Sequence, residues 1–181
     1  MPRVRGASFL YKNSYDGTMI AILYNIRSVH NVGSIFRTAD AAGIKKLYLC
    51  GITPTPLDRF KQKRKDFIKA SLGAEDSVPW EKVGSTIHDA QEKTLALMQR
   101  LKKDGHEIVA VEQDTNSIPY TSYHPAQKPV AFMVGNEVDG IPKEILAVSD
   151  TILDIPMYGT KESLNVSVAF GIAAFEIKKV L

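Results

Sequence analysis

The sequence predicts an α/β fold in which a mostly parallel β-sheet is flanked by helices. Two observations carry this prediction: short apolar runs typical of buried strands, and segments between them with the apolar period of a helix. Strands of a parallel sheet are apolar throughout because helices cover both faces. At 181 residues, 44% of them hydrophobic, the chain is long enough for one globular core. We expect a short N-terminal extension, residues 1–18, and a single domain, residues 19–181.

Five short apolar runs are expected to form the sheet. Their β-branched, aromatic and leucine residues favour buried strands, and alternation with helices favours short parallel crossovers. The runs occupy residues 19–26, 45–50, 107–112, 129–135 and 151–156.

Three longer segments have helical periodicity. The first occupies residues 31–42, where Asn31 can cap the start and Gly43 can end the helix. The second, residues 85–103, is amphipathic. The third, residues 165–180, is apolar almost all round, and such a helix is usually buried. Because this helix lies at the chain terminus, a second copy of the protein could bury its remaining apolar surface, and we expect a homodimer. A monomeric mass in solution would count against this expectation.

Charge is concentrated in one segment rather than spread over the chain. The whole chain carries 23 Lys and Arg against 20 Asp and Glu. Residues 59–69 alone hold six basic side chains against one acidic one. This segment is either a solvated face or loop, or a surface for a polyanion.

The remaining global features indicate a cytoplasmic protein. Cys50 is the single cysteine, which excludes an intrachain disulfide and fits a reducing compartment. We expect it to be a buried structural thiol. The sequence has no signal peptide and no apolar stretch of the roughly 20 residues that span a bilayer, so no membrane partner is expected.

Several familiar catalytic patterns are absent. The G-x-x-x-x-G spacing from Gly135 to Gly140 is followed by Ile141 and Pro142 instead of the Lys and Ser/Thr of a phosphate loop. No G-x-G-x-x-G and no G-x-S-x-G occurs, and the four histidines are scattered without metal-ligand spacing. Hydrolase, kinase and dehydrogenase functions therefore lose support, and no metal is expected.

Three blocks of the sequence place small, amide and hydroxyl residues in the connection between a predicted strand and the helix that follows it. They span residues 25–43, 132–142 and 155–176. Ligands of open α/β sheets bind at the carboxyl ends of the strands. Three such blocks in one chain predict a single composite site.

Together the three blocks resemble the signature motifs of the SpoU (TrmH) family of RNA 2′-O-ribose methyltransferases, in the SPOUT superfamily. The first motif, N-x-G-x-x-x-R-T-A, starts at Asn31, and the second, G-x-E-x-x-G, starts at Gly135. The third, I-P-M-x-G-x-x-x-S-L-N-V-S-V-A, runs over residues 155–169. Order and intervals agree as well, so the resemblance covers nearly the whole chain beyond residue 19.

The resemblance implies a fold that periodicity cannot give. In this family the C-terminal segment forms a deep trefoil knot, S-adenosylmethionine binds in the knot, and a homodimer builds the site. Topology rules alone argue against a knot. Carried over by motif position, the cofactor-binding residues are Val111, Glu112, Gly135, Ile155, Ser163, Leu164 and Asn165. Ser163 is equally a candidate cap for the last helix.

The resemblance also implies the catalytic residues Arg37, Asn31, Glu137 and Asn165. Arg37 would hold an RNA phosphate and stabilise charge on the ribose oxygen; a guanidinium keeps its proton, so the proton acceptor stays open. Asn31 would cap its helix or hold the target nucleotide, and Glu137 would orient Arg37 or bind across the dimer. Thr38, Ala39 and Ser167 are expected to pack. With RNA as partner, the basic segment becomes an RNA-facing surface. Its RNA-binding candidates, together with Arg37, are Arg59, Lys61, Lys63, Arg64 and Lys65.

The resulting expectation is an S-adenosylmethionine-dependent RNA 2′-O-ribose methyltransferase. No separate RNA-binding domain is expected before residue 19, which favours tRNA, whose compact shape a small dimer can grip, over rRNA. Three alternatives remain: an rRNA 2′-O-methyltransferase, a catalytically silent RNA-binding paralogue, and an unrelated α/β nucleotide-binding enzyme.

Overall fold

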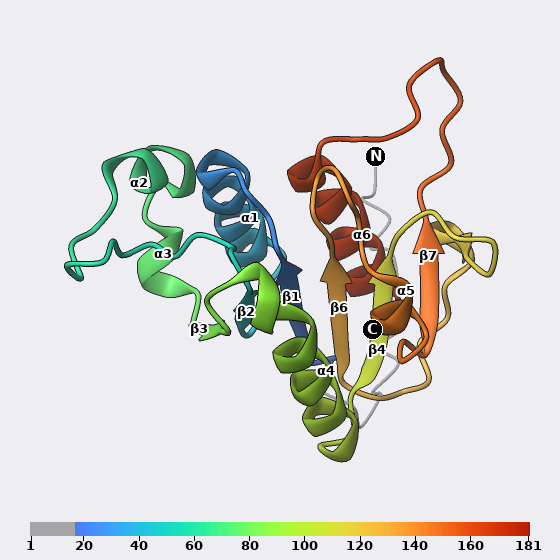
Figure 1. Cartoon of the computed structure of the whole chain (residues 1–181). Coiled ribbons are helices and arrows are strands. Elements are labelled where there is room, and N and C mark those ends of the chain that lie inside the picture. Colours follow the sequence, from blue (N-terminus) through green and yellow to red (C-terminus); the bar gives the residue numbers. More distant parts are fainter. Residues whose placement is uncertain (1–16) are drawn as a thin grey trace, which may run out of the picture.

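Seven parallel strands form one sheet in the computed structural model, which describes residues 17–181 (Figure 1). The expected N-terminal extension lies almost wholly outside the described residues. The strand order is β3-β2-β1-β6-β4-β7-β5, and every pairing is parallel. The strands are β1 Met19–Tyr24, β2 Leu47–Cys50, β3 Trp80–Val83, β4 Glu107–Val111, β5 Ile118–Pro119, β6 Val130–Val134 and β7 Thr151–Asp154.

The five predicted strands are confirmed, and the two missed strands are the two edges of the sheet. β3 is half-buried along its length, and β5 is only two exposed residues that include Pro119. Edge strands need not be apolar on both faces, and proline is tolerated there because its missing N–H faces no neighbour. Neither strand therefore carries the apolar signature of a buried one.

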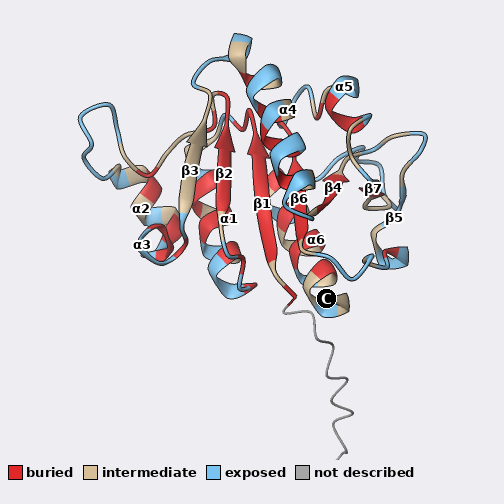
Figure 2. Ribbon diagram, turned by 90° about the horizontal axis from the view of Figure 1, so that it is seen from below, coloured by how far each residue is buried: buried red, intermediate tan, exposed pale blue. Residues whose placement is uncertain are grey.

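Helices cover both faces of the sheet. The helices are α1 Val29–Ala41, α2 Lys65–Ser71, α3 Ala74–Ser77, α4 Ile87–Lys103, α5 Lys143–Leu146 and α6 Val166–Val180, and a short 3₁₀ turn spans Tyr120–Ser122. Side chains of a strand alternate between faces, so Ala21 and Leu23 pack with α1 and α6, whereas Ile20 and Ile22 pack with α4 and α5. Figure 2 shows these two layers on opposite sides of the buried central strands.

The start of α1 differs from the prediction. Ser28 is its N-cap, with an extended backbone and a hydroxyl that accepts a hydrogen bond from the backbone N–H of Asn31 at 3.2 Å. The expected cap at Asn31 is therefore wrong, and the helix begins two residues earlier, at Val29. A serine that precedes an apolar period is an equally good cap. The consequence is that the Asn31 side chain is free to point away from its helix.

The C-terminal helix α6 lies where it was predicted, with Asn165 as its N-cap. The expected alternative, a cap at Ser163, is wrong. One side of α6 is buried against the sheet through Val166, Phe170 and Ile177. Its other side leaves Val168 50% and Phe175 53% exposed, so an apolar surface remains uncovered within one described chain.

Three further features of the described residues concern the thiol, the membrane and metal ions. Cys50 is fully buried, and burial raises the pKa of its thiol to about 11, which keeps it protonated at neutral pH. None of the helices in residues 17–181 has the length and apolar content needed to cross a membrane. In the same residues no group of three or more His, Cys, Asp or Glu side chains is arranged to hold a metal ion.

Candidate active site

A pocket of about 220 Å³ lies at the carboxyl ends of β4, β6 and β7. Because these three strands are neighbours and parallel, the segments that follow them meet at one edge of the sheet. The pocket is lined by Val111, Glu112, Gln113, Val134, Gly135, Asn136, Glu137, Val138, Gly140, Leu153, Ile155, Met157, Ser163, Leu164, Val166 and Ala169. All but one of the residues expected at a cofactor site line it; the exception is Asn165.

The loop after β6 is tight enough to require glycine at its start. A Cβ on Gly135 would lie 2.6 Å from the Ile141 side chain and 2.7 Å from the Gly140 carbonyl carbon. Gly140 itself has a φ of +65°, a conformation that side chains rarely adopt. The two motif glycines therefore fold residues 135–140 back on themselves and leave their backbone at the pocket wall.

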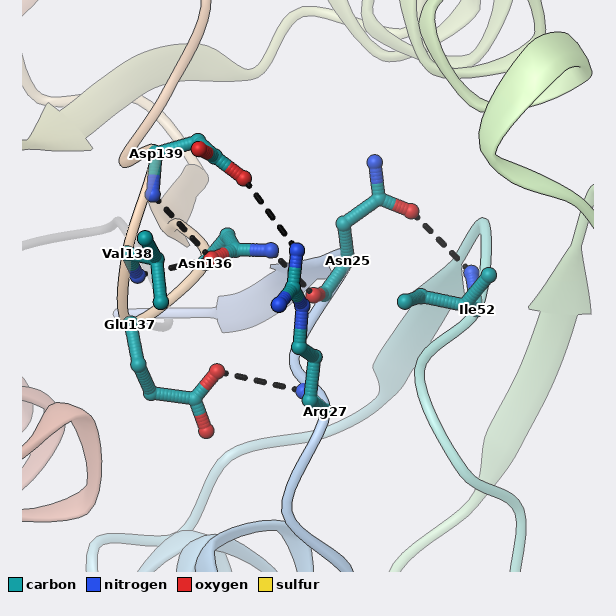
Figure 3. A network of polar contacts seen from close by, with 7 residues as sticks. All are labelled: Asn25, Arg27, Ile52, Asn136, Glu137, Val138 and Asp139. Carbon is teal, nitrogen blue, oxygen red and sulfur yellow. Dashed lines mark hydrogen bonds and ion pairs between the residues drawn. The ribbon is translucent and has the colours of Figure 1, made fainter.

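Asn136 holds this loop to the first strand. Its Oδ1 accepts hydrogen bonds from the N–H groups of Val138 (2.7 Å) and Asp139 (3.1 Å), and its Nδ2 donates to the backbone carbonyl of Asn25 (3.0 Å). Figure 3 shows this amide between the two segments, with Arg27 reaching past it to Asp139. Asn136 was not among the predicted site residues; the signal available in the sequence was an amide side chain directly after Gly135 in an expected ligand loop.

Glu112 supports the same loop from the end of β4. One carboxylate oxygen accepts from the N–H of Ile141 at 2.9 Å, and the other accepts from the N–H of Gln113 at 2.9 Å. A Cβ on Gly140 would lie 2.5 Å from this carboxylate. The side chain of Glu112 is thus committed to backbone groups, although the residue lines the pocket.

A chain of side-chain amides joins the three motif blocks. Asn31 donates from Nδ2 to Glu137 Oε1 at 2.8 Å, and its Oδ1 accepts from Asn165 Nδ2 at 3.1 Å. Asn165 in turn accepts from the N–H and hydroxyl of Ser167, at 2.9 and 2.6 Å. One hydrogen-bonded line therefore runs from the second motif through the first to the third, which is the composite site that the sequence predicted. Ser167, expected to pack, belongs to this line.

The Glu137 carboxylate is the acceptor at the end of that line. Besides Asn31, it accepts from the backbone N–H groups of Arg27 at 3.1 Å and Ser28 at 3.4 Å. Figure 3 shows the contact with Arg27. Burial by itself would raise the pKa of Glu137, but these hydrogen bonds favour the charged form and hold the pKa below its usual range. Glu137 is therefore a carboxylate anchored over the start of α1. Arg27 and Ser28 were not among the predicted site residues.

Arg37 lies apart from this network. It is exposed, two turns along α1 from Asn31, beside a hollow lined by Ser71, Gly73 and Ser77. It makes no hydrogen bond or ion pair with any residue of the described chain, and Glu137 does not orient it there. The structure thus brings together Asn31, Glu137 and Asn165 and leaves Arg37 pointing to solvent.

The predicted RNA-binding residues other than Arg37 lie between β2 and the start of α2. Lys63 forms an ion pair with Asp76 (Nζ–Oδ1 2.7 Å), and Arg64 pairs more loosely with Asp66 at 3.5 Å. Lys65 is the first residue of α2, whereas Arg59 and Lys61 stand on the exposed loop before it. Their positive charges are therefore only partly neutralised.

Comparison with known proteins gives a consistent result. The profile described as "SpoU rRNA Methylase family" matches residues 18–175. The chain is 32% identical over 161 residues to the tRNA (guanosine(18)-2′-O)-methyltransferase of Aquifex aeolicus, which covers 89% of this chain and 69% of that protein.

Two solved structures share the fold. An AdoMet-bound rRNA methyltransferase from Sinorhizobium meliloti superposes with a TM-score of 0.76 at 28% identity, and the match covers 90% of this chain but 56% of that one. A structure described as giving insights into the 2-OH methylation of C/U34 on tRNA has a TM-score of 0.68 at 25% identity, with 91% of this chain and 97% of that chain covered.

These matches agree with the three motifs and with the pocket that the motifs build. The predicted resemblance to the SpoU family is confirmed. At the level of the family, RNA methyltransferase activity and the cofactor S-adenosylmethionine are confirmed as well. The chain belongs to the SpoU rRNA methylase family.

Proposed function

We propose that this chain transfers a methyl group from S-adenosylmethionine to the 2′-hydroxyl of a ribose in tRNA. The observation that carries the proposal is the hydrogen-bonded line Glu137–Asn31–Asn165 at the rim of the pocket. It ties the three family motifs into one constellation, and none of its members has been replaced. An intact constellation is evidence against the silent RNA-binding paralogue.

The pocket fits the cofactor by the chemistry of its lining. Val111, Ile155 and Leu164 offer apolar surface suited to an adenosine ring, and the backbone of the 135–140 loop offers N–H and C=O groups for its polar edges. Gly135, which has no side chain, lets this loop fold tightly against Ile141 and Gly140 at the pocket wall. When bound, S-adenosylmethionine supplies a methyl group on a positively charged sulfur.

The protein's own residues would place and stabilise the reacting ribose. Asn31 and Asn165 hold each other at fixed positions beside the pocket, so they can orient a nucleotide without reorganisation. Arg37 keeps its proton and would clamp a phosphate and stabilise negative charge that develops on the ribose oxygen. Because Arg37 faces solvent in one chain, the substrate or a second subunit has to bring the reacting groups to it.

A homodimer is part of this proposal, and so is the family's C-terminal knot. The exposed apolar side of α6, which includes Val168 and Phe175, supports a second copy as its cover. The knot is supported by the lining of the pocket, to which both the 135–140 loop and residues 155–169 contribute. Figure 1 shows the long excursion after β7 returning beside the β6 loop to enter α6.

The relatives leave two substrate classes, and we favour tRNA. The Aquifex aeolicus protein is named for guanosine 18 of tRNA. The solved structure described as concerning C/U34 of tRNA is matched by this chain over 97% of its length. The Sinorhizobium meliloti protein is described as an rRNA methyltransferase, and this chain spans only 56% of it. An rRNA substrate is therefore the second candidate.

The test is methyl transfer from labelled S-adenosylmethionine to total RNA that lacks its own modification, followed by nucleoside mapping. We expect a 2′-O-methylated nucleoside in the tRNA fraction. Arg37→Ala should lower the rate by about 100-fold or more, the loss expected when one charge-stabilising group is removed, while calorimetric cofactor binding stays unchanged. Arg100→Ala, an exposed arginine on α4, is the matched control. Cofactor binding without transfer to any RNA would contradict the proposal and favour the silent paralogue, and a labelled nucleoside in rRNA would move the substrate to the second class.

A further inference from the structure

The segment before α2 is a folded hairpin rather than an irregular basic loop. Leu57 and Lys63 form an antiparallel bridge, the N–H of Asp58 donates to the carbonyl of Gln62 at 2.9 Å, and the N–H of Arg64 donates to the carbonyl of Pro56 at 3.0 Å. We call residues 56–64 the basic hairpin. Figure 2 shows it projecting from the α2 end of the molecule as an exposed element.

Asp58 fixes the tip of the basic hairpin. Its Oδ1 accepts from the N–H groups of Phe60 at 2.8 Å and Gln62 at 2.9 Å, and its backbone carbonyl accepts from the N–H of Lys61 at 3.0 Å. Lys61 has a φ of +62°, a conformation in which glycine is the usual residue. A side chain kept at such a position, on a tip tied by three hydrogen bonds, indicates a preorganised surface.

The tip presents an aromatic ring to solvent. Phe60 is 67% exposed, and its ring packs with the guanidinium of Arg59 at 4.7 Å from the ring centroid. The ring contributes to neither of the two apolar cores and lies outside the cofactor pocket. Neither folding nor the site at β6 therefore accounts for a phenylalanine at this position.

The charges around Phe60 point to the chemistry of its partner. Arg59 and Lys61 flank it in sequence, and neither forms an ion pair with a carboxylate in the described part of the chain. An apolar protein surface would have to cover these two cations at a desolvation cost. A nucleic acid offers a partner for both features: its bases have flat aromatic faces that stack on the ring, and its phosphates carry negative charge for Arg59 and Lys61.

We propose that Phe60 is a stacking platform for an unpaired base of the RNA substrate, with Arg59 and Lys61 on the neighbouring phosphates. The inference rests on the proposed RNA methyltransferase function and names a feature of its substrate. A base stacks on an aromatic side chain only when it is unstacked from its own helix, as in loops, bulges and single strands. No residue of the basic hairpin lines the cofactor pocket. The stacked base in this proposal is accordingly a second unpaired nucleotide, distinct from the methylated one, and the substrate must display both.

The experiment measures binding of the full chain to a short single-stranded RNA that carries one 2-aminopurine, whose fluorescence falls when it stacks, as a function of salt concentration. Phe60→Ala should weaken binding by roughly tenfold and abolish the quenching, because a stacked base is lost. Its plot of log affinity against log salt should keep the wild-type slope, since no phosphate contact has changed. Lys61→Ala should flatten that slope by about 0.7 and leave the quenching intact.

Two further variants separate stacking from general hydrophobic contact. Phe60→Trp should restore affinity and quenching, whereas Phe60→Leu should behave like Phe60→Ala because it has no aromatic face. Ile118→Ala removes an exposed apolar side chain at the opposite edge of the sheet and should bind as the wild type does. Sedimentation of Phe60→Ala should give the wild-type mass.

The inference is overturned if Phe60→Ala binds the single strand with wild-type affinity, if it loses the same affinity for a blunt RNA duplex, or if its mass falls because the ring joins two copies of the chain. Since these readouts do not use methyl transfer, they separate the two proposals. Failure of the wild-type chain to methylate any RNA counts against the proposed function alone. Active enzyme whose RNA affinity ignores Phe60 counts against the stacking role alone.

Discussion

At the residue scale, Glu137 shows how one carboxylate can organise a site without reacting in it. It accepts hydrogen bonds from the Asn31 amide and from two backbone N–H groups at the start of α1. These donors hold its pKa below the ordinary value of 4.5 against the opposing effect of burial. A group that stays charged and fully bonded at neutral pH positions its neighbours and is a poor proton acceptor.

The depressed pKa gives a prediction with a definite sign. Because the folded-state pKa of Glu137 lies below its unfolded value, its stabilising contribution is present above pH 4.5 and is lost as pH falls through the folded-state pKa. Glu137→Gln should therefore lower the free energy of unfolding at neutral pH and show a smaller further loss on acidification than the wild type. Urea unfolding at neutral and acidic pH measures both effects.

The control for this comparison is Glu92→Gln, which changes an exposed carboxylate on α4 outside the site. Parallel acid dependence of the wild type and Glu137→Gln would refute the assignment of Glu137 as the anchoring acceptor.

At the element scale, a motif glycine sets the distance between two helices. Gly33 lies on α1 where α2 crosses it, and a Cβ at this position would stand 2.6 Å from the Cβ of Ala70 and 3.0 Å from the carbonyl oxygen of Phe67. The motif glycine thus serves the packing of α2, the helix that follows the basic hairpin, rather than ligand binding. Its place in a functional motif says nothing by itself about which of these roles it has.

We expect Gly33→Ala to destabilise the protein by about 1–3 kcal/mol, because two helix backbones must separate. In an uncrowded helix the same change stabilises by about 1 kcal/mol. Gly171→Ala on α6 is the matched control, since its Cβ would meet only the Thr38 methyl group at an ordinary 3.7 Å. Thermal unfolding of both variants, and of Gly33→Ala combined with Ala70→Gly, is the measurement; the double variant should recover part of the loss. Equal melting temperatures for the two single variants would contradict the packing role.

At the scale of the whole molecule, the two faces of the sheet differ in how completely they are covered. α4 buries its large apolar side chains against β1 and β2 except for Ile87 at its start, whereas α6 buries one side and exposes both Val168 and Phe175 on the other. Val168 and Phe175 are seven residues apart and therefore lie on the same side of α6, and a continuous exposed apolar surface is typical of an interface.

Phe175→Glu should therefore convert the proposed dimer into a monomer and abolish methyl transfer, because a charge would be buried at the interface. Sedimentation equilibrium and the labelled-methyl assay test the two consequences together. The control is Ile87→Glu, a similarly exposed apolar residue on α4 at the opposite face of the sheet. A dimer that persists in Phe175→Glu would place the contact between subunits elsewhere.

Sequence patterns predicted the parts of this structure that depend on apolar burial. They missed the parts in which a polar side chain has several possible hydrogen-bond partners. The central strands, α6 and the C-terminal end of α4 agree with the apolar periodicity, whereas α4 begins two residues later than predicted, at Ile87. The cap of α1 did not, because Ser28 and Asn31 are both good caps and only the approach of Glu137 favours a free Asn31 side chain. The structural role of Asp58 was missed for a similar reason: a carboxylate beside six cations suggests an ion pair, whereas it binds backbone N–H groups of its own loop.

The amide line at the pocket rim also has a consequence for how the protein is made. Asn31 is synthesised early, yet its two partners follow 106 and 134 residues later in the chain. The second edge of β1 likewise pairs with β6, which follows more than 100 residues later in the chain. Contacts so distant in sequence slow folding, because a long loop must close before they form. A chain emerging from the ribosome can therefore pair β1 with β2 early, but it completes the amide line of the site only after residue 165 has been released.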